Sequence, residues 1–297
     1  MNWAGVFPAL TTKFTQDNRL DLALQAKNTN AQIAAGVHGV ILAGSLGEAS
    51  TITESEKEIL LKSTLEVAAD RIPVLLNIAE GSTDEAIKQA QNAEKWGAQA
   101  IMLLPPMRYK SDHRETVHFF KQVATNSNLP IMIYNNPIDY KIEVTIEMFA
   151  ELIDCKNIQA TKESTRDVSN VSRLKSNFGD RIKILCGVDT IASEELIMGA
   201  DGWVAGLCDA FPVETVAIYN FIKSNQFEKA IEIHRWFLPL LELDLHPKLV
   251  QYIKLAESMV GIGSEFVRGP RLTLEGAERT RIMNIINKSL ANRPTIN

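Results

Sequence analysis

The segments Pro130-Ile-Met-Ile-Tyr134-Asn-Asn-Pro137 and Ala160-Thr-Lys162-Glu-Ser164 follow one pattern, a short apolar run that ends in polar side chains. Apolar runs without alternation are typical of parallel strands that are buried on both faces of the sheet. Two such strands in succession place Tyr134 and Lys162 at neighbouring carboxyl ends. The pair therefore indicates both a parallel sheet and a polar site at its edge.

The same unit, an apolar strand followed by a helix, recurs along the chain. The expected strands are Gly5–Thr11, Gly39–Ala43, Pro73–Ile78, Ala100–Leu104, Pro130–Tyr134, Ile158–Lys162, Lys183–Cys186 and Gly202–Ala205. The expected helices are Arg19–Ala35, one opening at Thr53, then Ser82–Trp96, His113–Ser127, Thr145–Ile153, Asp167–Phe178, Ile191–Met198 and Pro212–Ile222.

Eight strand–helix units are the number that closes a (β/α)8 TIM barrel. We therefore predict an α/β protein with the barrel over residues 1–224 and a helical extension, packed on it, over residues 225–297. The extension would contain helices Phe227–Leu243, Pro247–Val260 and Glu275–Leu290. An open doubly wound sheet is the alternative, but the Gly-x-Gly-x-x-Gly turn that it usually carries does not follow Thr11.

Composition excludes several classes of function. The 297 residues are 45% hydrophobic and 23% charged with a net charge of −5, and no Lys/Arg cluster suits nucleic acid or anionic lipid. No apolar run approaches the length of a membrane span, and the first residues do not resemble a signal peptide. Cys155, Cys186 and Cys208 are too far apart to suggest a disulfide framework. We expect a cytoplasmic protein that binds a small molecule.

Lys162 is the sharpest catalytic candidate. An exposed lysine, with a pKa near ~10.4, is protonated at neutral pH, whereas burial lowers the pKa and frees the amine to attack a carbonyl or imine carbon. Pairing of Lys162 with Glu163 or with a neighbouring carboxylate would be the plainer explanation of this residue alone. Tyr134 on the adjacent strand favours a catalytic lysine over an ion-paired one, because Schiff-base chemistry needs a group that transfers protons.

Other polar and glycine residues follow the remaining strands. Gly44-Ser45-Leu46-Gly47-Glu48 lacks the Gly-Lys-Ser/Thr of a phosphate loop, but its amides and hydroxyl could bind a carboxylate. Asn136 ends the fifth strand, and Gly187 after the seventh could make room for a ligand or form a plain turn. The five histidines show no metal-ligand spacing, and no Gly-x-Ser-x-Gly elbow indicates a hydrolase.

At these residues the sequence resembles the dihydrodipicolinate synthase / N-acetylneuraminate lyase family. The resemblance rests on Gly44-Ser-Leu-Gly47-Glu48, Tyr134-Asn-Asn-Pro137 and Lys162-Glu163, in this order and spacing. It implies a TIM barrel, usually tetrameric, that needs no metal or organic cofactor. It assigns the Schiff base to Lys162, proton transfer to Tyr134, carboxylate binding to Ser45 and the amide of Leu46, and contact with the keto acid to Val204.

Departures from the family pattern narrow the expected activity. Leu46 replaces a second hydroxyl, Met107 stands where the family has an interface tyrosine, with Tyr109 near but displaced, and Asp139 replaces an arginine. Lysine biosynthesis is therefore not the activity we expect.

Four segments, three of them beyond the motifs above, resemble 1-pyrroline-4-hydroxy-2-carboxylate deaminases, which implies a deaminase of hydroxyproline degradation that forms 2-oxoglutarate semialdehyde and ammonia. Those segments are Leu104–Lys110, Tyr134–Pro137, Arg235–Leu240 and Lys248–Lys254. The alternatives are an aldolase or dehydratase of 2-keto-3-deoxy sugar acids, dihydrodipicolinate synthase, and a keto-acid sensor without turnover. A homo-oligomer, a tetramer or dimer, is expected.

Overall fold

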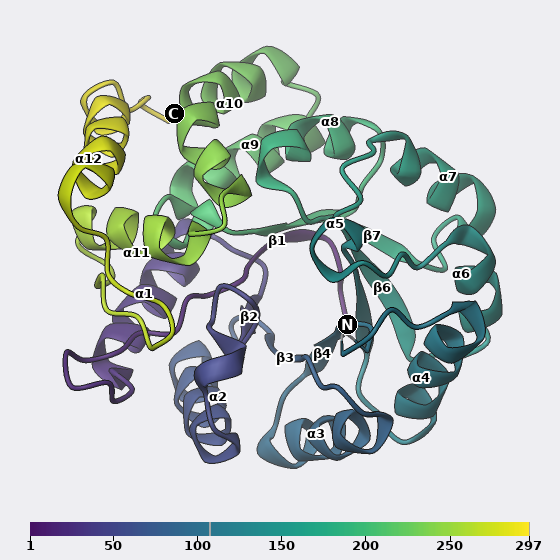
Figure 1. The fold of residues 1–297 in the computed structure, drawn as a ribbon. Coiled ribbons are helices and arrows are strands. Elements are labelled where there is room, and N and C mark those ends of the chain that lie inside the picture. The colour runs from purple at the N-terminus through teal and green to yellow at the C-terminus, as the bar shows by residue number, and fades with distance from the viewer. Residues whose placement is uncertain (107, 297) are drawn as a thin grey trace.

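The computed structural model describes residues 1–106 and 108–296 and contains one parallel sheet of eight strands (Figure 1). The strands are β1 Gly5–Pro8, β2 Val40–Leu42, β3 Val74–Ile78, β4 Ala100–Leu103, β5 Ile131–Asn135, β6 Ile158–Glu163, β7 Lys183–Cys186 and β8 Gly202–Ala205. Their order is β1-β8-β7-β6-β5-β4-β3-β2. A parallel bridge between Ala9 and Ile41 joins the two ends of this order and closes the barrel.

Helices surround the sheet, as the buried strands require (Figure 1). They are α1 Leu22–Ala35, α2 Glu54–Ala68, α3 Thr83–Trp96, α4 His113–Thr125, α5 Pro137–Tyr140, α6 Ile146–Leu152, α7 Ser169–Phe178, α8 Ala192–Ile197 and α9 Pro212–Lys223. Short 3-10 turns are η1 Ala49–Thr51, η2 Asp189–Ile191, η3 Leu207–Asp209 and η4 Glu242–Leu245. The prediction of a TIM barrel is confirmed, and the open doubly wound sheet is wrong.

Local sequence sets most helix ends. Thr53 and Glu56 form the expected capping box of α2, in which each side chain bonds the backbone amide of the other residue. Gly36 ends α1 in the left-handed conformation that glycine adopts without strain. The expected start of α1 at Arg19 is wrong, because the Asp21 side chain caps the amide of Leu24 and the helix begins at Leu22.

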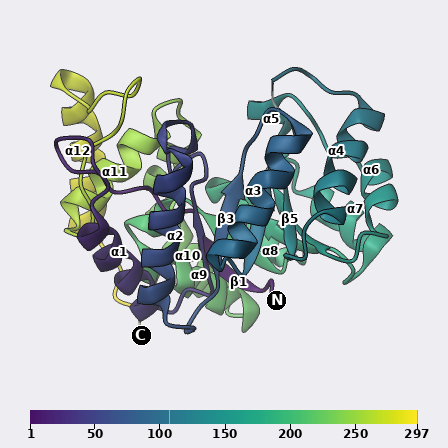
Figure 2. The same cartoon turned by 90° about the horizontal axis from the view of Figure 1, so that it is seen from below.

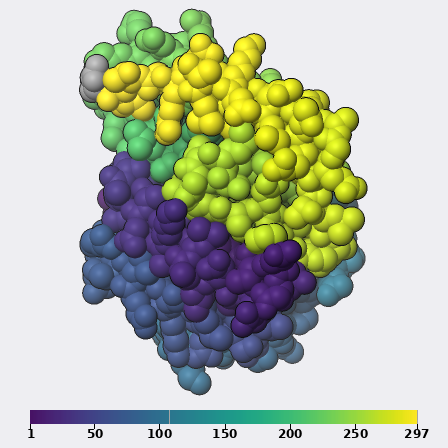
Figure 3. Space-filling model, turned by 90° about the vertical axis from the view of Figure 1, so that its left-hand side faces the viewer, coloured from purple at the N-terminus to yellow at the C-terminus, as the bar shows by residue number. Residues whose placement is uncertain are grey.

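Three helices follow the barrel: α10 Phe227–Leu241, α11 Leu249–Met259 and α12 Gly276–Ala291. Phe211 at the start of α9 packs against Trp236 and Phe237 of α10, with ring centroids 6.0 and 5.5 Å apart. Figure 3 shows that this last part of the chain also lies against the N-terminal segment, where the Arg268 guanidinium donates to the carbonyl of Asn18. A unit boundary near residue 224 remains our proposal. Among the described residues, no helix is long and apolar enough to cross a membrane.

The candidate site lies at the end of the barrel where the carboxyl ends of the strands meet. In the side view of Figure 2, the short helix α5 lies at the end opposite the N-terminus, where the strands finish. The sequence analysis does not foresee α5, which Asn136 caps by accepting from the amide of Asp139, with Pro137 at its first position. The carboxyl ends of the strands and α5 together frame the cavity described next.

Candidate active site

A cavity of about 100 Å³ opens at the carboxyl ends of the strands. All eight residues that the sequence analysis assigns to the site line it: Gly44, Ser45, Leu46, Tyr134, Asn136, Lys162, Gly187 and Val204. Asp139, Tyr140, Ser164, Arg166 and Asp244 also contribute to its wall. The cavity therefore brings together residues that lie far apart in the chain, such as Gly44 and Asp244, which are 200 positions apart.

Lys162 and Tyr134 are direct neighbours in the sheet register of β5 and β6. The Lys162 Nζ lies 4.0 Å from the centroid of the Tyr134 ring, and both residues are less than 10% exposed. Burial lowers the pKa of Lys162, although Tyr140, Asp244, Asp189 and Asp139 oppose that shift. Within the described residues, no hydrogen bond or ion pair reaches the Lys162 amine. Burial therefore favours the neutral form of this amine, which is the form that nucleophilic attack requires.

Glu163 does not pair with Lys162, so the plainer explanation of this lysine is wrong. Successive side chains on a strand point to opposite faces, and the Glu163 carboxylate lies on the helix side of β6. There it accepts from the amide of Thr165 at 2.8 Å, from Asn170 Nδ2 at 2.8 Å and from Asn135 Nδ2 at 3.4 Å.

The turn Gly44–Glu48 after β2 presents unused donors to the cavity. Its later amides bond within the turn, Glu48 to the carbonyl of Ser45 and Ala49 to that of Gly44. No acceptor in the described part of the chain takes the amides of Ser45 and Leu46. Adjacent free amides form a concavity for an anion.

Buried contacts fix this turn from below. The Thr12 hydroxyl donates to the carbonyl of Gly47 at 2.7 Å, and Asn77 Nδ2 donates to that of Ala43 at 3.0 Å. The fully buried Glu48 carboxylate accepts from Lys254 Nζ at 2.5 Å and from the amide of Arg268 at 3.0 Å. The C-terminal part of the chain therefore holds a turn that belongs to the first half of the barrel.

Tyr140 is a second phenol in the cavity. Its hydroxyl lies 2.5 Å from Ser45 Oγ, and its ring meets that of Tyr134 edge-on with centroids 5.4 Å apart. Burial raises the pKa of Tyr140, and it raises the pKa of Tyr134 to about 12. Asn136 Nδ2 donates both to the Tyr134 hydroxyl at 3.2 Å and to Asp139 Oδ2 at 2.8 Å. Two protonated phenols therefore lie near the lysine at neutral pH.

The opposite wall is shaped by β7 and β8. A Cβ at Gly187 would lie 2.0 Å from Ser164 Oγ and 2.7 Å from Lys162 Cγ, so only glycine leaves room for the lysine. Asp189 is buried and accepts from Trp203 Nε1 at 2.9 Å and from the amides of Gly206 and Leu207. This carboxylate holds the loop after β8, which follows Val204, against the cavity.

Sequence reasoning missed Tyr140, Arg166 and Asp244. The cap at Asn136 with Pro137 was a usable signal for Tyr140, because one helical turn brings residue 140 back over residue 136. Asp244 reaches the cavity only through the packing of α10 and α11, which no local pattern reveals. Tyr109 is 56% exposed and does not line the cavity, and Met107 lies outside the described residues.

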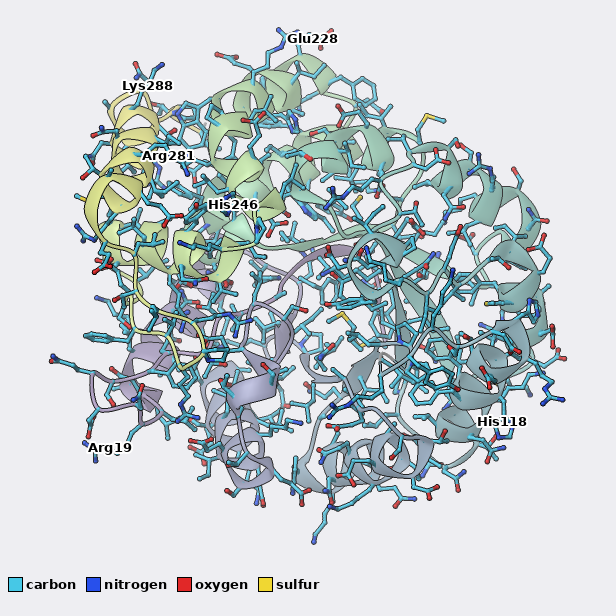
Figure 4. The ribbon with its side chains drawn as sticks, viewed as in Figure 1. Arg19, His118, Glu228, His246, Arg281 and Lys288 are labelled. Atoms are coloured by element: carbon cyan, nitrogen blue, oxygen red, sulfur yellow. The ribbon has the colours of Figure 1, made fainter. Side chains whose placement is uncertain are left out.

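Metal binding finds no support in the described residues, where no group of three or more His, Cys, Asp or Glu side chains could hold an ion. His113 and His118 are exposed on the solvent side of α4, and His118 points away from the barrel (Figure 4). All three cysteines fall in the described part and are free thiols.

A closed barrel with a buried lysine at the carboxyl ends of its strands, to which no other described residue bonds, defines a TIM-barrel enzyme that acts on a small molecule. The chain belongs to the dihydrodipicolinate synthetase family, whose model matches residues 2–289. Members of this family are class I Schiff-base lyases, and the chain is accordingly an enzyme of the lyase type.

Several 4-hydroxy-tetrahydrodipicolinate synthases are similar to this chain along most of its length. The protein from Exiguobacterium sibiricum is 33% identical over 91% of this chain and 91% of its own. The one from Brucella abortus is 30% identical over 94% of this chain and 95% of its own.

Solved structures agree in fold. The dihydrodipicolinate synthase of Thermotoga maritima superposes with a TM-score of 0.92 at 26% identity, covering 97% of this chain and 99% of that one. A monomeric dihydrodipicolinate synthase variant gives 0.92 at 25% identity, covering 97% of each chain.

Proposed function

We propose that Lys162 forms a Schiff base with the C2 carbon of a 2-oxo acid or of its cyclic imine. The observation that carries this proposal is the position of the Lys162 amine, which is buried, has no hydrogen-bond or ion-pair partner among the described residues, and lies 4.0 Å from the Tyr134 ring centroid. The lowered pKa of Lys162 supports it, because attack requires the neutral amine. The iminium that forms is itself the electron sink, so the proposed chemistry requires no metal or organic cofactor.

The substrate carboxylate would bind at the turn after β2. Ser45 Oγ and the amide of Leu46 are the proposed donors, since the amides of Ser45 and Leu46 lack acceptors in the described chain. Gly187 and Val204 would form the wall beside the keto acid, and Asn136 would orient the Tyr134 hydroxyl that it already contacts. Binding the carboxylate in this turn would orient C2 for attack by the lysine.

Tyr134 would transfer the protons. Its hydroxyl accepts a hydrogen bond from Asn136, which leaves its own proton free to be donated to the nitrogen or oxygen that departs from C2. Its pKa of about 12 keeps it protonated at neutral pH, which suits a donor that later takes a proton back from C3.

We propose 1-pyrroline-4-hydroxy-2-carboxylate as the substrate. Lys162 adds to C2 and displaces the ring nitrogen, which becomes a primary amine on C5. Loss of a C3 proton gives an enamine that expels the C4 hydroxyl as water. Tautomerisation then moves the double bond to C5 as an imine. Hydrolysis at C5 and C2 releases ammonia and 2-oxoglutarate semialdehyde, so that the sum consumes one water molecule.

A second candidate is the synthase activity of the relatives named above, in which pyruvate bound to the lysine condenses with aspartate semialdehyde. Arg166 favours it, because this arginine lines the cavity and, among the described residues, has no ion-pair or hydrogen-bond partner. An unpaired guanidinium suits a second carboxylate. Against it stand Leu46 in place of a hydroxyl and Asp139 in place of an arginine.

A substrate panel tests the proposal. The purified chain is incubated with the pyrroline, with pyruvate plus aspartate semialdehyde, and with a 2-keto-3-deoxy sugar acid, while ammonia and pyruvate are measured. Ammonia release from the pyrroline, absent in Lys162→Ala, supports the deaminase. Pyruvate release without ammonia indicates an aldolase, pyruvate consumption with the semialdehyde indicates the synthase, and tight binding without turnover indicates a sensor.

We further propose a cytoplasmic homo-oligomer, a tetramer or dimer. The three free cysteines are compatible with that compartment, and the family resemblance supports the assembly. One of the similar solved structures is described as a monomeric variant, so the mass of the assembly in solution is the measurement that decides.

A further inference from the structure

Asp244 brings a carboxylate to the cavity from outside the eight barrel units. It lies on η4, in the segment that links α10 to α11 and that His246 marks in Figure 4. The residue is part-buried and lines the cavity together with Lys162. In the described part of the chain, no hydrogen bond or ion pair reaches this carboxylate. Nothing in the barrel framework accounts for its presence there.

The residues around Asp244 leave its carboxyl group accessible to a ligand in the cavity. A Cβ at Gly206 would lie 2.7 Å from Asp244 Oδ1, so this glycine leaves the carboxylate its place. The neighbouring Asp189 carboxylate is already occupied by Trp203 and the amides of the β8 loop. Burial raises the pKa of Asp244 to about 8, although the nearby Lys162 and Arg166 side chains oppose that shift, so this carboxyl group is largely protonated at neutral pH.

Ser164 supplies an independent sign of a ligand. Its side chain is 2% exposed, lines the same cavity, and its Oγ has no partner within the described residues. A buried polar group without a partner carries a desolvation cost that a bound ligand can remove. Two unsatisfied acceptors, Asp244 and Ser164, therefore line the cavity in which Lys162 would hold the substrate.

We propose that Asp244, assisted by Ser164, binds a hydroxyl or amine group that the substrate carries beyond its C3 carbon. The inference rests on the proposed Schiff base at Lys162 and names the class of substrate that this site selects. A carboxyl group there, protonated or ionised, forms a hydrogen bond with a hydroxyl or amine, and its ionised form disfavours a second carboxylate. In the pyrroline reaction the candidate groups are the C4 hydroxyl and the nitrogen released from C2.

The test uses two ligands that differ only in one hydroxyl, 2-oxopentanoate and 4-hydroxy-2-oxopentanoate. Each is trapped on the protein with borohydride, and the half-saturating concentration is read from the adduct by mass spectrometry. We expect the wild type to favour the hydroxylated ligand by about ten-fold, as one well-formed hydrogen bond provides. Asp244→Ala should remove that preference. The half-saturating concentration of 2-oxopentanoate should change by less than about two-fold, because this ligand lacks the hydroxyl and loses no hydrogen bond.

Glu242→Ala is the matched control, because Glu242 is exposed on the same short helix and should keep the preference. A preference that survives in Asp244→Ala, or an equal weakening of both ligands, overturns the role of Asp244. A wild type that no ligand modifies contradicts the Schiff base instead. In that case the binding affinities of the two ligands are compared by calorimetry. A preference for the hydroxylated ligand that is lost in Asp244→Ala supports the role of Asp244, and any other result overturns it.

Discussion

The hydroxyl oxygens of Ser45 and Tyr140 lie 2.5 Å apart and join the turn after β2 to the helix after β5. Ser45 also lies in the proposed carboxylate site, and the Tyr140 ring contacts the ring of Tyr134. The contact therefore links the group that would bind the substrate to the group that would transfer its protons. Both partners belong to one chain, so the link does not depend on a neighbouring subunit.

Tyr140→Phe is expected to slow proton transfer more than imine formation. The variant keeps the ring but loses the hydroxyl that contacts Ser45 and that would relay protons to Tyr134, and loss of a positioned proton-transfer group costs roughly 10²-fold or more in rate. We expect turnover to fall by about that factor, while borohydride trapping of Lys162 falls far less. Tyr109→Phe is the control, since Tyr109 is exposed and does not line the cavity. Equal loss of trapping and turnover would show that Tyr140 only supports the fold.

Trapping at Lys162 should depend on pH in a defined direction. Burial places the pKa of Lys162 below that of a free lysine, so the neutral amine is present at pH values where an exposed lysine is fully charged. The trapping rate should therefore fall as the pH drops through this lowered pKa and reach a plateau above it, well below ~10.4. A trapping rate that still rises in proportion to the hydroxide concentration up to pH ~10.4 would contradict a lowered pKa of Lys162.

Replacing Glu195 by glutamine should stabilise the protein in a pH-dependent manner. Its two carboxylate oxygens are buried without a partner in the described residues, and burial, helped by the nearby Glu163 carboxylate, raises its pKa to about 8. Because the folded state binds the proton more tightly, stability is full below the unfolded pKa near ~4.3 and is lost as the pH rises through the folded pKa. Glu195→Gln should therefore raise the melting temperature by several degrees at pH 9 and change it little at pH 4.

Glu194→Gln is the matched control, since Glu194 is the adjacent, exposed residue of α8. Differential scanning calorimetry of both variants across this pH range makes the comparison. A gain for Glu195→Gln that is equal at both pH values would indicate improved packing rather than relief of a buried charge.

The ion pair between Lys254 and Glu48 should matter more to stability than any exposed pair. Both side chains are fully buried, with Nζ 2.5 Å from Oε1, and removing one partner leaves an uncompensated buried charge. Lys254→Met should lower the free energy of unfolding by about 3–5 kcal/mol. Lys62→Met, which breaks the exposed pair with Glu58, should cost less than about 1 kcal/mol. Denaturant titration distinguishes the two, and similar costs would contradict the account.

Sequence reasoning reached the barrel because each strand and helix carries its own local signal. Apolar runs such as Ile131–Asn135 can lie only between covered faces, and a cap such as Thr53 marks a helix start. Tyr134 and Lys162 were found because each ends a strand, and the carboxyl ends of parallel strands meet. Asp244 was not found, since its place depends on how α10 and α11 pack on the barrel rather than on any neighbouring residue.

Borohydride reduction in the presence of the pyrroline, followed by peptide mapping, tests the central claim most directly. The account predicts a single covalent adduct on the peptide that contains Lys162, with none formed by Lys162→Arg, which keeps a charge but cannot form the imine. A reduced adduct mapped to another lysine, or ammonia released at an unchanged rate by Lys162→Arg, would contradict it.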